Sequence, residues 1–130
     1  MTIAVDTNVL VRYLTWDEEK QAIAAARVLE AGKPISVANI VLCELAWVLR
    51  RAYRCTPEEI TAAISRVVES RNVISDRAAA EMGLIMLRRG GDFADGVIEC
   101  DAMRARCRHI ATFDQQFARL LDPERVVLLP

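Results

Sequence analysis

The sequence predicts an α/β fold in which a short parallel sheet is flanked by helices on both faces. Short runs of β-forming residues alternate with helical patterns along the whole chain. Alternation of this kind implies crossover connections between parallel strands. At 130 residues, with 53% hydrophobic residues, the chain has the size of one folded domain. We therefore expect a single domain over residues 1–130.

The first half of the chain predicts three helical segments between short strands. Residues 2–5 favour a strand, followed by helical sequence to about residue 31 with a break near residues 15–17. A second strand is expected at 34–37, and Asn39 is expected to cap a helix to about residue 53. Thr56, followed by Pro57 and two acids, is typical of the start of another helix, to about residue 70.

The second half continues the alternation. A third strand is expected at 72–74, and Asp76 begins a helix to about residue 89, where two glycines break the chain. A helix from about residue 95 to 107 and a strand at 109–111 follow. A short helix begins near Asp114, and residues 125–129 form the last strand.

Several classes of protein are disfavoured by the composition. No apolar run approaches the roughly 20 residues needed to cross a bilayer, and the N-terminal segment reaches Asp6 without the basic region of a signal peptide. The expected location is the cytoplasm. The four cysteines form no CxxC pair and there is one histidine, so small buried thiols are favoured over a zinc or redox site.

The net charge of −1 does not indicate a nucleic-acid binder, but arginine greatly outnumbers lysine among the basic residues. Only Lys20 and Lys33 are lysines, and the other basic residues are arginines. Arginine suits bidentate recognition of phosphate or carboxylate, although high genomic GC content would produce the same bias.

Two acids directly follow predicted strands. Asp6 ends the first strand and Asp114 follows the strand that begins near His109. Ligands of open parallel sheets bind at the carboxyl ends of strands, and the two acids would converge if their strands are adjacent. The alternative is that each acid only caps the helix that follows it.

Glu44 is the only charged residue between positions 39 and 49. On a helix its neighbours are Ile40, Val41, Trp47 and Val48, so no local cation can pair with it. A carboxylate in apolar surroundings is costly unless something distant compensates it. A metal ion would do so. An exposed strip on the helix, or an arginine from another element, remains the alternative.

Four acids also stand close together between residues 92 and 101, with no basic residue among them. Asp95 and Glu99 are one helical turn apart, an arrangement that repels unless a cation is present. Asp92 or Asp95 can cap the helix, but capping explains one acid only. Oxygen ligands without histidine or cysteine select Mg²⁺ or Mn²⁺, and such a cluster suits hydrolysis of a phosphodiester.

These residues resemble the PIN-domain family of ribonucleases. The resemblance is carried by residues 6–10, by the lone Glu44 in its apolar helix, by the segment from Asp92 to Asp95 and by Thr112 to Asp114, in order and at similar spacing. It covers essentially the whole chain, and the length is similar to that of the VapC-type toxins of toxin–antitoxin pairs.

The resemblance implies a Mg²⁺- or Mn²⁺-dependent endoribonuclease with a Rossmann-like sheet, held inactive by a cognate antitoxin. It implies that the metal-binding catalytic acids are Asp6, Glu44, Asp95 and Asp114. The supporting polar positions are Asn8, Thr112 and Asp92, of which Asp92 is either close to the ligands or only a loop acid. The rim that faces RNA is expected to include Arg12, Arg50, Arg51, Arg88 and Arg89, although ordinary solvated helix surface is the alternative for each.

Other small α/β classes fit less well. An aspartyl-nucleophile phosphatase needs a second acid where Asn8 stands, and both it and a phospho-receiver domain need a lysine near the site. The remaining alternative is a PIN fold that binds RNA or protein without cutting. The segment from residue 39 to 70 also holds many apolar residues, from which we expect a homodimer or a surface covered by the antitoxin. The apolar residues that support this expectation are Trp47, Val48, Leu49, Ile60, Ile64, Val67 and Val68.

Overall fold

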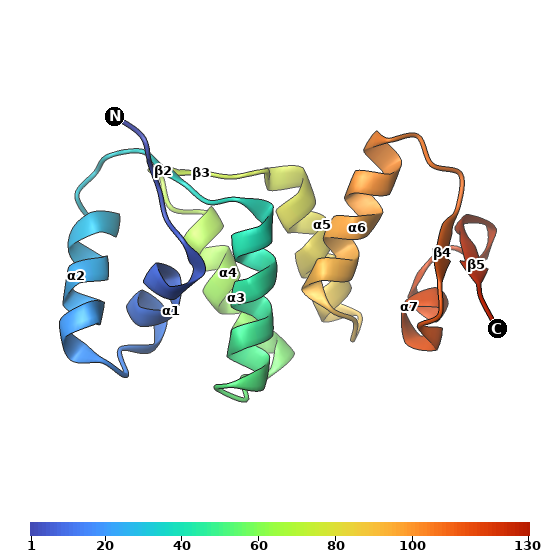
Figure 1. The fold of residues 1–130 in the computed structure, drawn as a ribbon, viewed down its shortest axis with the longest axis horizontal. Coiled ribbons are helices and arrows are strands. Elements are labelled where there is room, and N and C mark those ends of the chain that lie inside the picture. The colour runs from blue at the N-terminus through green and yellow to red at the C-terminus, as the bar shows by residue number, and fades with distance from the viewer. The chain divides into compact units, whose positions relative to one another are not determined.

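The structure is a computed structural model that describes residues 1–130. It contains seven α-helices, one short 3-10 helix and five strands (Figure 1). The chain divides into two compact units, which we describe one after the other: unit 1 is Met1–Arg77 and unit 2 is Ala78–Pro130.

Unit 1 is built on a three-stranded parallel sheet in the order β1-β2-β3. Its strands are β1 (Ile3–Ala4), β2 (Ile35–Ser36) and β3 (Val73–Ile74). Helices α1 (Thr7–Thr15) and α2 (Glu19–Leu29) connect β1 to β2, and helices α3 (Asn39–Arg51) and α4 (Pro57–Val68) connect β2 to β3. Ile35 pairs with Ile3 on one side and Val73 on the other, and its side chain is fully buried. The predicted α/β fold with parallel strands is confirmed.

The helix starts follow local hydrogen bonds that the sequence partly predicts. Thr56 and Glu59 form a capping box at the start of α4, with Pro57 in its first turn. The prediction for Asn39 was wrong, because Ala38 occupies the capping position and Asn39 is already helical. The Asn39 side chain instead donates to Asp76 at 3.1 Å, which ties the start of α3 to the residue before α5.

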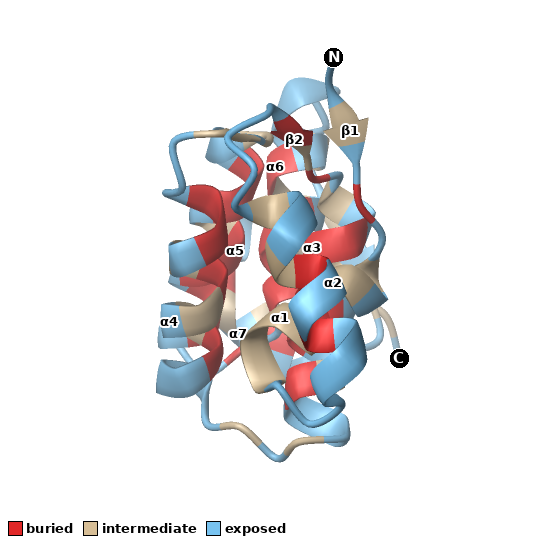
Figure 2. Ribbon diagram, turned by 90° about the vertical axis from the view of Figure 1, so that its left-hand side faces the viewer, coloured by how far each residue is buried: buried red, intermediate tan, exposed pale blue.

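Most of the apolar residues that we expected at a homodimer or antitoxin interface are buried in the core of unit 1. Buried residues lie along one side of α4 (Figure 2). Of the seven apolar residues on which that expectation depends, the protein itself buries Leu49, Ile60, Ile64, Val67 and Val68. Of the interface residues, only Trp47 is exposed, and Val48 is half-buried. The expected surplus of apolar surface is therefore much smaller than the sequence suggested.

Unit 2 contains two parallel strands and the helices before and between them. Its elements are α5 (Arg77–Arg88, beginning at the last residue of unit 1), α6 (Phe93–Arg104), β4 (Ile110–Thr112), α7 (Gln115–Leu120), a 3-10 helix at Pro123–Arg125 and β5 (Val126–Leu128). Strands β4 and β5 pair in parallel, and α7 crosses between them. Met86, Phe117 and Leu121 form a buried cluster.

The boundaries within unit 2 differ from the predicted ones by a few residues. Gly90 adopts a left-handed conformation (φ 92°) after α5, as a glycine readily does, and ends that helix where the sequence predicts. Helix α6 begins at Phe93, earlier than expected, because Phe93 is a core residue with 2% of its side chain exposed. None of the helices combines the length and apolar character that crossing a bilayer requires.

Candidate active site

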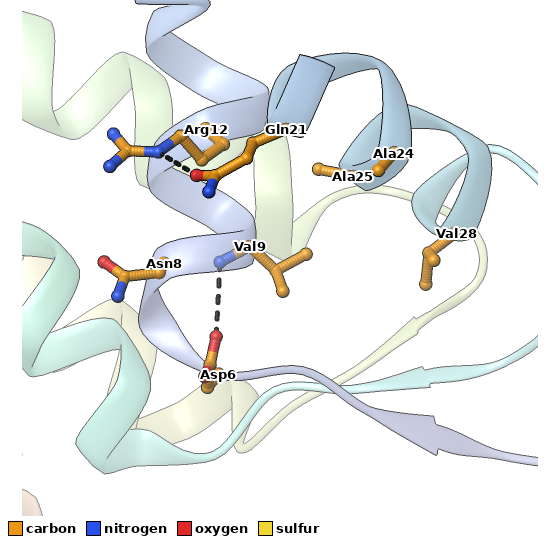
Figure 3. A pocket seen from close by; sticks show the side chains of 8 residues that line it. All are labelled: Asp6, Asn8, Val9, Arg12, Gln21, Ala24, Ala25 and Val28. Carbon is orange, nitrogen blue, oxygen red and sulfur yellow. Dashed lines mark hydrogen bonds between the residues drawn. The ribbon is translucent and has the colours of Figure 1, made fainter. Parts of the chain in front are cut away.

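Asp6 lies at the point where β1 gives way to α1. Its backbone is extended and its side chain caps α1, because Oδ1 accepts a hydrogen bond from the N–H of Val9 at 3.3 Å (Figure 3). The capping alternative raised by the sequence is therefore correct. It does not exclude metal binding, since a carboxylate offers about four acceptor sites and this cap uses one of them. Asp6 and Asn8 are both exposed.

Glu44 lies on α3, which packs against α1. The hydroxyl of Thr7 donates to Glu44 Oε1 at 3.1 Å, so the residue next to Asp6 in the chain touches the Glu44 carboxylate. Unit 1 thus brings these two predicted ligands close together. Glu44 is exposed on the solvent side of α3, so the alternative of an exposed strip on this helix is correct. No arginine compensates it.

Asp95 is the central acid of unit 2. It lies in the first turn of α6 and is half-buried. Burial, followed by the charges of Asp92 and Asp114, raises the pKa of Asp95 to about 6. These three carboxylates therefore lie close enough to repel one another, and no cation is among the groups that act on Asp95. A neighbouring cation would relieve both the burial cost and the repulsion.

Asp114 is held in place from both sides. Its Oδ1 accepts a hydrogen bond from the N–H of Phe117 at 3.1 Å, so it caps α7, as the alternative reading expected. The N–H of Asp114 donates to the hydroxyl of Thr112 at 3.0 Å. Thr112 therefore fixes the backbone that carries the acid. Within its own unit, strand β4 pairs with β5, and Asp114 lies just beyond the carboxyl end of β4.

Two glycines that sequence reasoning missed fix the position of Asp95. A Cβ on Gly96 would collide with the backbone carbonyl of Met82, and one on Gly83 would lie 2.5 Å from the ring of Phe93. Helices α5 and α6 thus approach closely only because both residues lack side chains. The available signal was a glycine inside each helical pattern, which usually marks a close approach of two backbones.

The predicted RNA-binding arginines fall into different surroundings. Arg12 is bound within unit 1: its Nε donates to Gln21 at 2.7 Å and its Nη1 donates to Asp17 at 3.1 Å and to Tyr53 at 3.3 Å. This network closes one end of an open hollow of about 390 Å³ between α1 and α2, and Asp6 and Asn8 line the other end (Figure 3). The other predicted rim arginines, Arg50, Arg51, Arg88 and Arg89, are exposed.

The donor set has the chemistry of a Mg²⁺ or Mn²⁺ site, because every predicted ligand is a carboxylate. Unit 1 supplies Asp6 and Glu44, and unit 2 supplies Asp95 and Asp114 with Asp92 beside them. No group of three or more acids, histidines or cysteines surrounds a single point as metal ligands would. The predicted donors therefore fit the metal in kind, and none of the four cysteines forms a disulfide.

Comparison with known families identifies the fold. A family model described as PIN domain matches residues 3–121, which include parts of both units and all four predicted ligands. The chain belongs to the PIN domain family. This confirms the family resemblance drawn from the sequence and indicates a nuclease-type domain, since PIN domains are generally nucleases that use divalent metal ions. Among curated proteins, none matches the chain.

Proposed function

We propose that this PIN domain is a Mg²⁺- or Mn²⁺-dependent endoribonuclease, with Asp6, Glu44, Asp95 and Asp114 as its metal-binding acids. The observation that carries the proposal is the environment of Asp95. Its pKa is raised to about 6 by burial and by two neighbouring acids, and no cation is among the groups that act on Asp95. A purely structural cluster of this kind would only destabilise the fold, whereas a metal site requires it.

The residues have distinct parts in the proposed reaction. A divalent ion held by these acids would supply an activated water and would stabilise the leaving oxygen of the phosphodiester. Asp95 and Asp114 provide the negative charge that would bind the ion in unit 2, and Thr112 fixes the backbone of Asp114. Thr7 orients the Glu44 carboxylate in unit 1, and Asn8 offers an exposed amide to a phosphate or a water molecule. The single histidine, His109, is exposed just before β4 and has no part in this scheme.

The test is cleavage of a labelled single-stranded RNA by the purified protein. We expect cleavage with Mg²⁺ or Mn²⁺, none with a chelator, and none by Asp6→Asn or Asp95→Asn. Glu58→Gln, an exposed acid in the first turn of α4, is the matched control and should cleave normally. Metal-independent RNA binding without any cleavage would instead favour a non-catalytic PIN module.

We further propose that the protein is the toxin of a toxin–antitoxin pair and acts on cellular RNA in the cytoplasm. A cognate antitoxin would hold it inactive by placing a basic side chain among the acids, where the negative potential attracts cations. Expression of the wild-type chain alone should arrest growth, and Asp6→Asn should not. Growth arrest by Asp6→Asn as well would contradict the proposal.

The homodimer also stays a proposal, on a smaller apolar surface than the sequence suggested. Exposed apolar side chains of unit 1 outside α3 include Ile23, Val28 and Ile74. Light scattering at micromolar concentration should give twice the 14.5 kDa mass of one chain. A monomer at that concentration would contradict the dimer and would leave the nuclease proposal unaffected.

A further inference from the structure

The exposed side of α3 carries a line of residues that includes one of the proposed metal ligands. We call it the α3 stripe: Ile40, Glu44, Trp47 and Arg51. Their spacing of four, three and four residues places them on one face of the helix. Ile40 is 66% exposed and Trp47 is 61% exposed, although both are large apolar residues.

Trp47 and Arg51 form a pair at one end of this stripe. The guanidinium carbon of Arg51 lies over the indole ring, 5.7 Å from its centroid. Arg51 is exposed, and no carboxylate lies within salt-bridge distance of it. The arginine therefore steadies the indole by a cation–π contact and keeps its charge available to a ligand.

We infer that Trp47 and Arg51 form a nucleotide subsite for the single-stranded RNA substrate, beside Glu44. A base would stack on the indole, and Arg51 would bind a neighbouring phosphate. An aromatic ring next to a basic side chain is the combination that single-stranded nucleic acids require. Arg51 lies seven positions after Glu44, which corresponds to a rise of about 10 Å along the helix. The inference rests on the proposed function, since it places the substrate along the ligand Glu44.

The composition of the stripe favours RNA over a protein partner. Charged residues are depleted from the centres of protein interfaces, whereas here Glu44 lies between the two apolar residues and Arg51 lies on Trp47. In a nucleotide, the base would stack on Trp47 and the phosphate would bind Arg51. Burial of the stripe against a second copy of the chain is the outcome that the test must separate from RNA binding.

The chain contains two tryptophans, which makes base stacking directly measurable. Trp16→Phe leaves Trp47 as the only indole, and Asp95→Asn in the same protein prevents cleavage. We expect the Trp47 emission to be quenched, with saturation, by a single-stranded RNA of about ten nucleotides. An oligomer of the same length without bases should bind and leave the emission unchanged. In the control protein Trp47→Phe, where Trp16 is the only tryptophan, RNA should not quench.

Cleavage kinetics of variants provide a second test of the subsite. Trp47→Ala should raise KM on the order of tenfold, more than it lowers kcat, and Trp47→Phe should restore most of the affinity. Arg51→Gln should raise KM and reduce its dependence on salt. Trp16→Ala removes an exposed tryptophan outside the stripe and should cleave like the wild type.

Three results would overturn the subsite. These are unchanged Trp47 emission at saturating RNA, a wild-type KM for Trp47→Ala, or an emission that shifts with protein concentration when no RNA is present. If Asp6→Asn abolishes cleavage and Trp47→Ala keeps the wild-type KM, the subsite fails and the nuclease stands. If the wild type does not cleave, the nuclease fails, and the quenching experiment still decides whether Trp47 contacts bases.

Discussion

Asp95 should reduce the stability of the metal-free protein. Its folded pKa of about 6 lies above the ordinary value of 3.8, so folding opposes its ionisation. The destabilisation is absent below pH 4, grows as the pH rises from 4 to 6 and is complete above that range. Because the side chain is partly solvated, Asp95→Asn should raise the free energy of unfolding at pH 7.5 by only about 1 kcal/mol.

Denaturant unfolding of metal-free wild type and metal-free Asp95→Asn at pH 4 and pH 7.5 measures whether Asp95 lowers the free energy of unfolding as the pH rises. The wild type and Asp95→Asn should be equally stable at the lower pH and should differ at the higher one. Asp101→Asn changes an exposed acid on the same helix and serves as the control. A wild type that gains stability relative to Asp95→Asn as the pH rises would contradict the account.

Glu44 should affect function without affecting the fold. The Glu44 side chain is exposed and its recorded contact is the hydrogen bond from Thr7, so Glu44→Gln should change the free energy of unfolding by less than about 1 kcal/mol. Its RNA cleavage should fall strongly, because the amide is a poor metal ligand. Thermal melts and cleavage rates measure the two effects. A loss of 3 kcal/mol or more with retained cleavage would reveal a structural ion pair instead.

At the scale of residues, the sequence could locate the acids but not their surroundings. Asp6 and Asp114 follow strands as predicted, and both also cap helices, because one carboxylate can serve both purposes. Glu44 was placed among apolar neighbours because its helix is apolar in sequence. Whether a side chain on an apolar helix is covered depends on how the next helix packs, and this long-range contact leaves no local signal.

Gly96 controls the approach of α6 to α5. A methyl group there would meet the backbone of Met82 and Gly83, which cannot move aside as a flexible side chain can. Gly96→Ala should therefore lower the free energy of unfolding by at least about 2 kcal/mol, despite the higher helix propensity of alanine. It should also reduce cleavage by displacing Asp95.

Chemical denaturation measures the change for Gly96→Ala. Ile98→Ala, on the same helix and exposed, is the control and should be nearly neutral. A Gly96→Ala protein as stable as the wild type would show that the two helices separate easily, and would remove this explanation for the position of Asp95.

At the scale of elements, local chemistry predicted more than periodicity did. The capping box at Thr56 and the break at Gly90 are found where the sequence places them, because each depends on neighbouring residues only. The start of α6 was missed by two residues, since Phe93 was not recognised as a core residue. All strands except β4 are shorter than expected, and their pairing partners are fixed by contacts between residues far apart in the chain.

At the scale of the whole molecule, the family match over residues 3–121 includes residues from both units. The chain divides into two compact units, and the expectation of one domain over residues 1–130 stays a prediction. The sequence identified the family because its acids recur in order, whereas the RNA target and the antitoxin depend on surface shape, which no local pattern encodes.

The central claim is that Asp6 of unit 1 and Asp95 of unit 2 are both needed to bind Mg²⁺ or Mn²⁺. Calorimetric titration with Mn²⁺ tests it most directly, using the wild type, Asp6→Asn from unit 1, Asp95→Asn from unit 2 and the control Glu58→Gln. The account predicts saturable binding by the wild type and the control, and at least tenfold weaker binding by both asparagine variants. Wild-type affinity in either asparagine variant, or no binding by the wild type, would contradict it.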